Sequence, residues 1–278
     1  MTVPASPPLV AKRRTDAVGI AMAVALTIVI IFPLLVVCTW AFANVWRFPN
    51  VIPQQFGLRY WYDTLARVDV WNALWISIRL SVTVTILSAL ICLPAAYAFA
   101  RLDFPFRNLL FFSFLAGHAF PKFGLLVAIA AIFLQLHLIG TFWGVVLIQL
   151  VGTLLFMIWI PVSAFQAVDK RMEEAARDVG AKPLRVFWSI TLPQAGPTIA
   201  AAILLSFVGT FYETEGAWLI GAPAISTTPV LMISFINNQP VIQYGAVLSM
   251  ILWIPSFAAL MFARRVIGSG AFARGFGA

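Results

Sequence analysis

The feature that most constrains this chain is a series of long apolar segments that contain almost no charged residues. A helix needs roughly 20 apolar residues to cross the hydrocarbon core of a bilayer, and six segments of the chain are at least that long. Only 10% of the 278 residues are charged and 62% are hydrophobic, whereas roughly 25% are charged in soluble domains. The sequence therefore predicts an integral membrane protein and excludes a large soluble catalytic domain.

These apolar segments predict helices, because the runs are continuous, whereas the strands of a membrane barrel alternate between apolar and polar residues. A single crossing must also satisfy its backbone polar groups internally, which a helix does. The predicted fold is an all-α integral membrane protein with six transmembrane helices, and residues 1–278 form a single transmembrane domain. The predicted spans are Val18–Ala43, Ala73–Phe99, Leu109–Leu134, Phe142–Gln166, Pro197–Ile220 and Val241–Phe262.

The distribution of basic residues predicts how the chain is oriented. An even number of spans places both termini on one side, and most Lys and Arg residues lie in the tails and loops of that side. They are Lys12, Arg13, Arg14, Arg101, Arg107, Lys170, Arg171, Arg177, Lys182, Arg185, Arg264, Arg265 and Arg274. Only Arg47, Arg59 and Arg67 lie in the opposite loops. Because cytoplasmic loops are enriched in Lys and Arg, both termini are predicted to be cytoplasmic, and the net charge of +8 requires no nucleic-acid partner.

The loop between the fourth and fifth predicted spans, residues 167–196, has the signals of a short helix. Asp169 is a suitable N-cap for a helix that continues to about Val179. Glu173 and Arg177 are spaced to form an i,i+4 ion pair on its surface. The apolar face of this helix is predicted to contain Met172, Ala175, Ala176 and Val179.

A second short helix is predicted directly after the first. Gly180 suits the position that follows a helix C-terminus, and Pro183 suits the first turn of the next helix. Pro193 and Pro197 are expected to end that helix and to redirect the chain into the fifth span. The exposed rim of this helix–turn–helix is predicted to consist of Glu173, Glu174, Arg177, Asp178 and Arg185.

The same loop carries a motif of known spacing. Glu174-Ala175-Ala176 is followed after three residues by Gly180, and after nine more residues by Ile190-Thr191-Leu192-Pro193. This pattern resembles the EAA signature of binding-protein-dependent ABC importer permeases, the type I importer subunits of the MalG- or PotC-like kind. The motif also lies between the fourth and fifth of six spans, as in that family.

The resemblance implies that the loop forms coupling helices, which insert into a groove on a separate nucleotide-binding ATPase subunit. The residues that it implies for ATPase coupling are Glu174, Ala175, Ala176, Asp178, Gly180, Ile190, Leu192 and Pro193. The other implied partners are a second homologous permease subunit and an extracytoplasmic solute-binding protein, in the inner membrane. ATP hydrolysis is expected on the partner, since this chain has no G-x-x-x-x-G-K-[ST] phosphate loop. No enzymatic activity, cofactor or metal is expected in this chain.

Four charged residues lie within the predicted spans: Arg79, Lys122, Glu213 and Glu215. Each costs about 2.5–3.5 kcal/mol at the centre of a membrane helix, so such residues are functional candidates. Lys122 follows Pro121, which is expected to kink the third span one turn after His118. Lys122 either contributes to the substrate pathway or forms a structural ion pair with one of the two glutamates.

Candidate pathway residues are Pro121, Lys122, Tyr212, Glu213 and Trp218. The Leu93-Pro94-Ala95-Ala96-Tyr97 segment and the acidic residues favour a polyamine or a similar small organic solute by resemblance. The Ala98-Phe99-Ala100-Arg101 segment is shared with carbohydrate importers, so a permease for a carbohydrate, polyol or glycerol phosphate is the alternative. An alternative of another class is an ion-coupled secondary carrier, which would need sites on broken helices in paired halves and no ATPase-docking loop.

The predicted orientation is tested by a topology reporter fused after Ala278. We expect the reporter to be active only in the cytoplasm, because the tails and loops assigned to that side contain most of the basic residues. Activity on the periplasmic side would overturn the whole orientation.

Overall fold

The computed structural model describes residues 17–47, 49–119, 121–238 and 241–267, and most of these are helical. The helices are α1 (Ala17–Ala41), α2 (Arg59–Leu65), α3 (Val68–Arg101), α4 (Arg107–Ala119), α5 (Lys122–Gln135), α6 (Phe142–Gln166), α7 (Lys170–Asp178), α8 (Pro183–Val186), the π-helix η1 (Phe187–Thr191), α9 (Leu192–Phe211), the π-helix η2 (Ala217–Gly221), α10 (Thr228–Asn238) and α11 (Ile242–Ile267). Two short strands, β1 (Ala43–Val45) and β2 (Gln55–Phe56), pair antiparallel.

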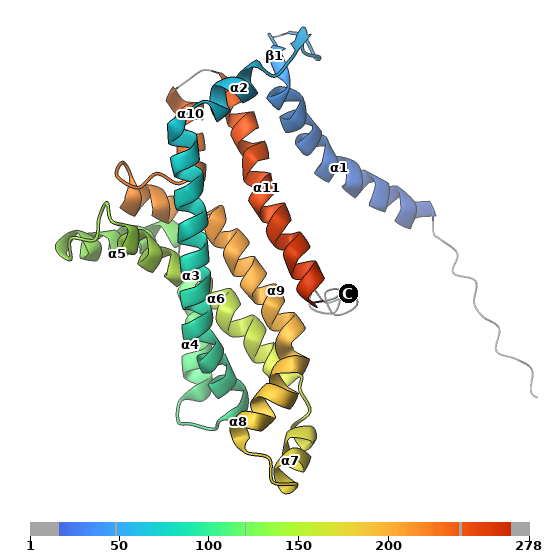
Figure 1. The fold of residues 1–278 in the computed structure, drawn as a ribbon, viewed down its shortest axis with the longest axis vertical. Helices are drawn as coiled ribbons and strands as arrows, with labels where there is room; N and C mark the ends of the chain where they lie inside the picture. The colour runs from blue at the N-terminus through green and yellow to red at the C-terminus, as the bar shows by residue number, and fades with distance from the viewer. Residues whose placement is uncertain (1–16, 48, 120, 239–240, 268–278) are drawn as a thin grey trace, which may run out of the picture.

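The centre of the molecule is formed by α3, α6 and α9, which pack against one another along most of their length (Figure 1). At 1.5 Å per residue, the 34 residues of α3 extend over about 51 Å, more than the roughly 30 Å of a hydrocarbon core. This helix therefore connects the two ends of the bundle. The β-strands, α2 and α10 lie at one end, whereas α7 and α8 lie at the other (Figure 1).

In the described part of the chain, four helices are long and apolar enough to cross a membrane: Gly19–Ala41, Val68–Arg101, Pro183–Phe211 and Ile242–Phe262. A fifth is the bent pair Phe142–Leu154 and Phe156–Gln166, whose two parts meet at 41°. The structure thus confirms a helical membrane protein with several apolar helices.

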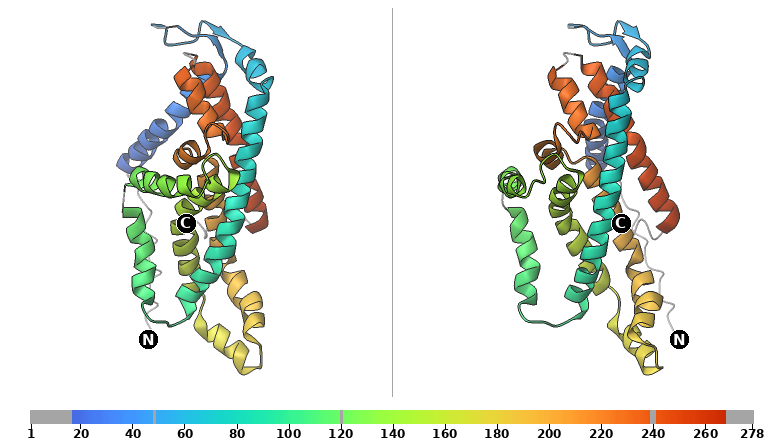
Figure 2. Two further views of the ribbon diagram at one scale, coloured as in Figure 1. Left: turned by 90° about the vertical axis from the view of Figure 1, so that its left-hand side faces the viewer. Right: turned by 60° about the vertical axis from the view of Figure 1, so that its left-hand side comes forward.

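The third predicted span is not a single helix. The segment Leu109–Leu134 is divided between α4 and α5, and Pro121 occupies the N-cap position of α5. Figure 2 shows α5 running across the direction of α4. A proline was expected to kink the helix here, and its missing N–H and its ring end the helix altogether. The His118 side chain and Phe120, which belong to the same predicted feature, lie outside the described part of the chain.

The prediction that Pro193 and Pro197 end a second short helix is wrong. Helical structure continues without a break from Pro183 to Phe211, and it passes both prolines. The π-helical turn η1 directly precedes Pro193, and the Leu192 amide donates to the Phe187 carbonyl five residues earlier. A wide turn of this kind relieves the steric clash of the proline ring and compensates for the hydrogen bond that a proline removes from an α-helix. The helix then ends at Phe211, before the predicted boundary at Ile220.

α1 differs from the other long helices in its surroundings. None of its most apolar 18-residue window is buried, and the helix contacts α11 and then leans away from the bundle (Figure 1). Large apolar side chains such as Ile28, Phe32 and Leu35 are exposed on it. In a membrane protein, such a face is covered by lipid or by another subunit.

Candidate functional site

The first part of the site is α7, whose two ends are fixed by local hydrogen bonds as the sequence predicts. At the N-terminus, the Asp169 side chain accepts a hydrogen bond of 2.9 Å from the Arg171 amide. At the C-terminus, the Ala181 amide donates to the Ala176 carbonyl (3.0 Å) and the Gly180 amide to the Arg177 carbonyl (2.8 Å). This is a Schellman motif, which requires a left-handed residue after the helix. Gly180 supplies it with a φ of 87°.

The second part of the motif lies where the chain turns back into the bundle. Pro183 begins α8 at its first position, as predicted. Ile190 lies in η1, and Leu192 and Pro193 are the first residues of α9. Ile190 and Leu192 are half-buried, so these residues support the base of the loop, while Glu174 and Gly180 lie on its exposed side.

The outer side of α7 and α8 forms an exposed surface of mixed character, which we call the loop surface. It consists of Glu174, Ala175, Asp178, Val179, Gly180, Leu184 and Trp188. Val179 is 86% exposed and Trp188 is 61% exposed, although both side chains are apolar. Exposed apolar patches bordered by polar residues mark sites of protein or membrane contact.

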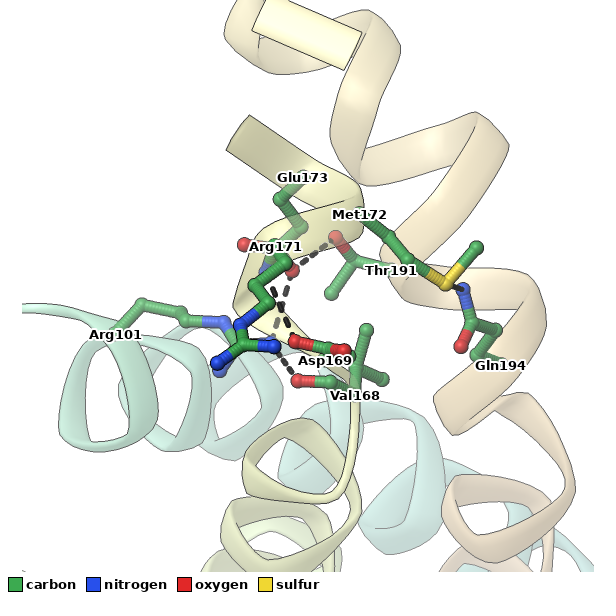
Figure 3. Close-up of polar contacts among 8 residues, drawn as sticks. All are labelled: Arg101, Val168, Asp169, Arg171, Met172, Glu173, Thr191 and Gln194. Atoms are coloured by element: carbon green, nitrogen blue, oxygen red, sulfur yellow. Dashed lines mark hydrogen bonds and ion pairs between the residues drawn. The ribbon is translucent and has the colours of Figure 1, made fainter. Parts of the chain in front are cut away.

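Glu173 does not belong to the exposed rim, and the predicted ion pair with Arg177 is wrong. Its carboxylate points into the protein, where Oε1 accepts hydrogen bonds from Arg101 Nη2 at 2.9 Å and from Thr191 Oγ1 at 2.7 Å. Arg101 Nη2 also donates to the Val168 carbonyl at 2.9 Å. Figure 3 shows Arg101 reaching from the end of α3 to the start of α7, with Thr191 on the other side. The helix phase thus turns Glu173 inward and leaves Glu174 on the surface.

This ion pair is buried, because the side chains of Arg101 and Glu173 are only 7% and 4% exposed. Removing one partner of such a pair leaves an uncompensated charge and costs about 3–5 kcal/mol. Within the described residues, Arg101 Nε has no hydrogen-bond partner, so the contact to Glu173 is made through one guanidinium nitrogen, Nη2. The buried pair therefore fixes α7 against the bundle as long as both charges remain.

A second polar cluster lies between α5, α6 and the break after α9. Lys122 Nζ lies 3.0 Å from Glu215 Oε2 and 3.6 Å from Glu213 Oε1. Both ion pairs that the sequence left open as alternatives to a pathway role are therefore present. The Lys122 side chain remains more than half exposed, so it is still accessible although it forms both ion pairs.

Glu213 has a clear structural role at the break in the fifth span. Its two carboxylate oxygens accept hydrogen bonds from the amides of Gly216 (2.8 Å) and Ala217 (3.0 Å). These amides begin the π-helical turn η2 and would otherwise be unpaired at membrane depth. Gln149 Nε2 also donates to Glu213, at 3.3 Å. The carboxylate is thus occupied by backbone, amide and lysine partners.

Beside this cluster lies a cavity of about 320 Å³ with a polar wall. Residues on α6 and α9 supply that wall at i,i+4 spacing: Gln149 and Thr153, and Ser206 and Thr210. Gln149 is buried, and its Oε1 has no hydrogen-bond partner among the described residues. The sequence analysis missed these four residues, although pairs of polar residues one turn apart in an apolar span were the available signal.

The structure separates the predicted pathway residues into two groups. Lys122 and Glu213 line the polar cavity, and Pro121 begins the helix that carries Lys122. Tyr212 points to α11 instead, where its hydroxyl donates to the Leu252 carbonyl at 3.2 Å. Trp218 is exposed on η2 and does not line the cavity. Within the described residues, no group of three or more His, Cys, Asp or Glu side chains could hold a metal ion.

Comparison with known proteins identifies the family of this chain. The family described as "Binding-protein-dependent transport system inner membrane component" matches residues 88–268, which include the loop with α7 and the polar cavity. The chain belongs to this family. It is therefore a multi-pass membrane protein and a permease component of an ABC importer, as the EAA-like motif indicated. An ion-coupled secondary carrier, the alternative of another class, does not fit this membership.

Individual relatives carry different cargoes. The maltose/maltodextrin transport system permease protein MalG of Vibrio vulnificus is 29% identical over 229 residues, which cover 75% of this chain and 77% of the relative. The molybdate/tungstate transport system permease protein WtpB of Pyrococcus furiosus is 28% identical over 234 residues, covering 83% and 91%. A solved bacterial alginate ABC transporter, in complex with an alginate pentasaccharide-bound periplasmic protein, matches with a TM-score of 0.69 at 12% identity, covering 91% and 94%. That match shows a shared fold.

The buried ion pair is tested by replacing Glu173 with alanine and measuring amide hydrogen exchange of residues 170–178 in detergent. We expect faster exchange, because Arg101 loses its carboxylate partner and the free energy of local opening falls by about 3–5 kcal/mol. The matched control is Asp103→Ala, which removes a 3.1 Å ion pair with Arg107 at a position that is 98% exposed, and should leave the segment unchanged. Equal exchange in the wild type and Glu173→Ala would contradict a stabilising role for the pair.

Proposed function

We propose that this chain forms half of the translocation pathway of an ATP-driven importer and that its loop surface docks onto a separate ATPase subunit. The observation that carries this proposal is a doubly capped helix at one end of the bundle (Figure 1), followed by exposed apolar side chains in the turn after it, in α8 and in η1. Nothing in the described part of the chain covers Val179, Leu184 or Trp188. A groove on a partner would remove this apolar area from water, and the adjacent acidic Glu174 and Asp178 would fix the register by charge complementarity.

The orientation follows from the same assignment. Arg101, Arg107, Arg171 and Arg185 lie in or beside α7 and α8 or at the neighbouring end of α3, which agrees with a cytoplasmic position of that end. Both termini are then cytoplasmic, and the chain crosses the membrane six times, with the pair of α4 and α5 as a broken third crossing. Among the basic residues of the tails, Lys12, Arg13, Arg14 and Arg274 lie outside the described residues, whereas Arg264 and Arg265 lie in the last turn of α11.

The remaining partners are a second homologous permease and an extracytoplasmic solute-binding protein. The exposed apolar surface of α1 supports a second permease subunit as a partner. Such a subunit would cover part of this helix, which the rest of the chain does not bury. The end of the bundle with the β-strands, α2 and α10 would receive the binding protein. In this arrangement the whole chain acts as a single transmembrane permease domain, and ATP hydrolysis takes place on the ATPase.

The docking role is tested by Gly180→Val and Glu174→Lys. A Cβ at position 180 would meet no atom within 4 Å in this chain, so the cost to the fold is on the order of 1 kcal/mol from the positive φ alone. We therefore expect both variants to insert normally but to lose solute uptake and co-purification of the ATPase. Ligand binding by the separate binding protein should not change. Normal transport, or failed transport with full ATPase association and stimulated hydrolysis, would show that the coupling assignment is wrong.

The polar cavity supports a neutral, hydroxylated solute as the cargo. The acidic residues that suggested an organic cation are already paired, because Lys122 contacts both Glu213 and Glu215. One lysine and one glutamate line the cavity, Lys122 and Glu213, and Glu215 pairs with the same lysine outside the lining. Its wall offers hydrogen-bond acceptors, since Thr153 and Thr210 donate their own protons to backbone carbonyls. Sugar hydroxyl groups supply the matching donors, in agreement with the maltodextrin that one relative is named for.

This assignment is tested by uptake into proteoliposomes that contain the complete importer and its binding protein. We expect accumulation of a labelled di- or oligosaccharide and none of spermidine or molybdate. Thr153→Val should lower the uptake rate roughly two- to tenfold, the equivalent of one hydrogen bond of about 0.5–1.5 kcal/mol. Ser163→Ala is the matched control, because it removes the same kind of bond to a backbone carbonyl on the same helix outside the cavity. Uptake of spermidine instead of a saccharide would overturn the assignment.

A further inference from the structure

We propose that the cluster of Arg101, Glu173 and Thr191 is the mechanical link through which movement of α7 reaches α3 and α9. This inference rests on the proposed docking of α7 to an ATPase subunit and identifies how that docking acts on the membrane helices. Arg101 and Glu173 are positioning residues, since neither lies on the loop surface that contacts the ATPase.

Apart from its chain connections to α6 and α8, α7 has few buried contacts that attach it to the bundle. Glu173 is the only residue of the nine in α7 that is buried. A helix that is held by apolar packing presents a stripe of buried residues three and four positions apart, and α7 has none. Its remaining side-chain contact to α9 is a long interaction of 3.8 Å between Gln194 Nε2 and Met172 Sδ. The one buried side chain of α7 is therefore a carboxylate, and it binds an arginine.

The three residues come from three different elements. Arg101 is the last residue of α3, Glu173 lies in the first turn of α7, and Thr191 ends the π-helical turn before α9. Oε1 of Glu173 accepts from both neighbours, at 2.9 Å and 2.7 Å. A displacement of α7 thus pulls on two membrane helices at one atom (Figure 3).

The contact to α3 is the decisive one. The chain itself connects α7 to α9 through α8 and η1, so α9 follows α7 even without Thr191. By contrast, α3 lies 72 positions away in sequence. In the described part of the chain, Arg101 makes the only side-chain hydrogen bonds between α3 and the segment that contains Val168 and Glu173. Since α3 runs the full length of the bundle, this contact joins the loop to the opposite end.

A charged hydrogen bond suits this task better than apolar packing does. Apolar contacts are non-directional and let surfaces slide past each other, whereas hydrogen bonds between ionised groups are shorter, stronger and geometrically specific. The Arg101 side chain is only 7% exposed, and at such a site a charged hydrogen bond is stronger than in water. Without it, movement of α7 would reach α3 only indirectly, through the chain connections of α7 and the packing of α6 and α9 on α3.

The test uses the complete importer, reconstituted with its ATPase, second permease and binding protein, and measures solute transported per ATP hydrolysed. The variant is Glu173→Gln, which keeps the size of the side chain and removes its charge. We expect the ATPase to co-purify and to hydrolyse ATP at the wild-type rate, while transport per ATP falls about tenfold. Thr191→Val should have a smaller effect, because α9 remains connected to α7 by the chain itself. Asp103→Asn is the control, since it breaks an exposed ion pair near the same end of α3.

A covalent replacement for the link provides the second arm. Arg101→Cys together with Glu173→Cys, in a background with Cys38→Ser and Cys92→Ala, removes the ion pair and allows a reversible bis-methanethiosulfonate cross-linker to bridge the two positions. We expect low transport per ATP before cross-linking, recovery after it, and loss again upon reduction. The proposal is overturned if Glu173→Gln transports as much per ATP as the wild type, if it loses ATPase association, or if the cross-link fails to restore coupling. Failure of the wild-type chain itself to associate with the ATPase would instead refute the proposed function.

Discussion

Every backbone N–H and C=O group at membrane depth needs a partner inside the protein, because the hydrocarbon core offers no water. Long uninterrupted helices such as α3 meet this requirement by themselves. Where a helix stops within the predicted membrane region, another group must take over, and in this chain polar side chains do so. Glu213 accepts from two amides at the start of η2, and Lys122 follows the proline that separates α4 from α5. The two helix interruptions therefore lie side by side, and the charged residues at them stabilise each other without a bound solute.

The proline residues act in two opposite ways, and the difference depends on what precedes each of them. Pro121 ends a helix, because the chain changes direction there and packs α5 across the bundle (Figure 2). Pro193 is passed without a break, because the π-helical turn η1 widens the helix just before it. This continuity joins α8, η1 and α9 into one helix, Pro183–Phe211, which begins beside α7 and has Thr210 of the polar cavity near its other end. One continuous helix therefore connects the loop to the cavity.

The loop combines a rigid small helix with a sparse attachment. Its two caps define the ends of α7 within a few residues, and its outer side is free for a partner. Inward, it offers one carboxylate to Arg101 and Thr191 (Figure 3). In the proposed coupling, such a loop keeps its own shape when displaced and transmits the displacement through a small number of strong contacts. The membership of this chain in the family of binding-protein-dependent transport components agrees with this geometry.

The sequence by itself determined the features whose hydrogen bonds close within a few residues: the apolar helices, the capped helix from Asp169 to Gly180, and the interruption at Pro121. It also determined the family, because the spacing of the motif from Glu174 to Pro193 is local. Only the tertiary structure decided which side of α7 faces inward, that Glu173 binds Arg101 and not Arg177, and that the polar residues of α6 and α9 share one cavity. It also decided that the helix continues past Pro193. These outcomes depend on how helices far apart in sequence are rotated against one another, and a rotation of one residue, about 100°, exchanges a buried glutamate for an exposed one.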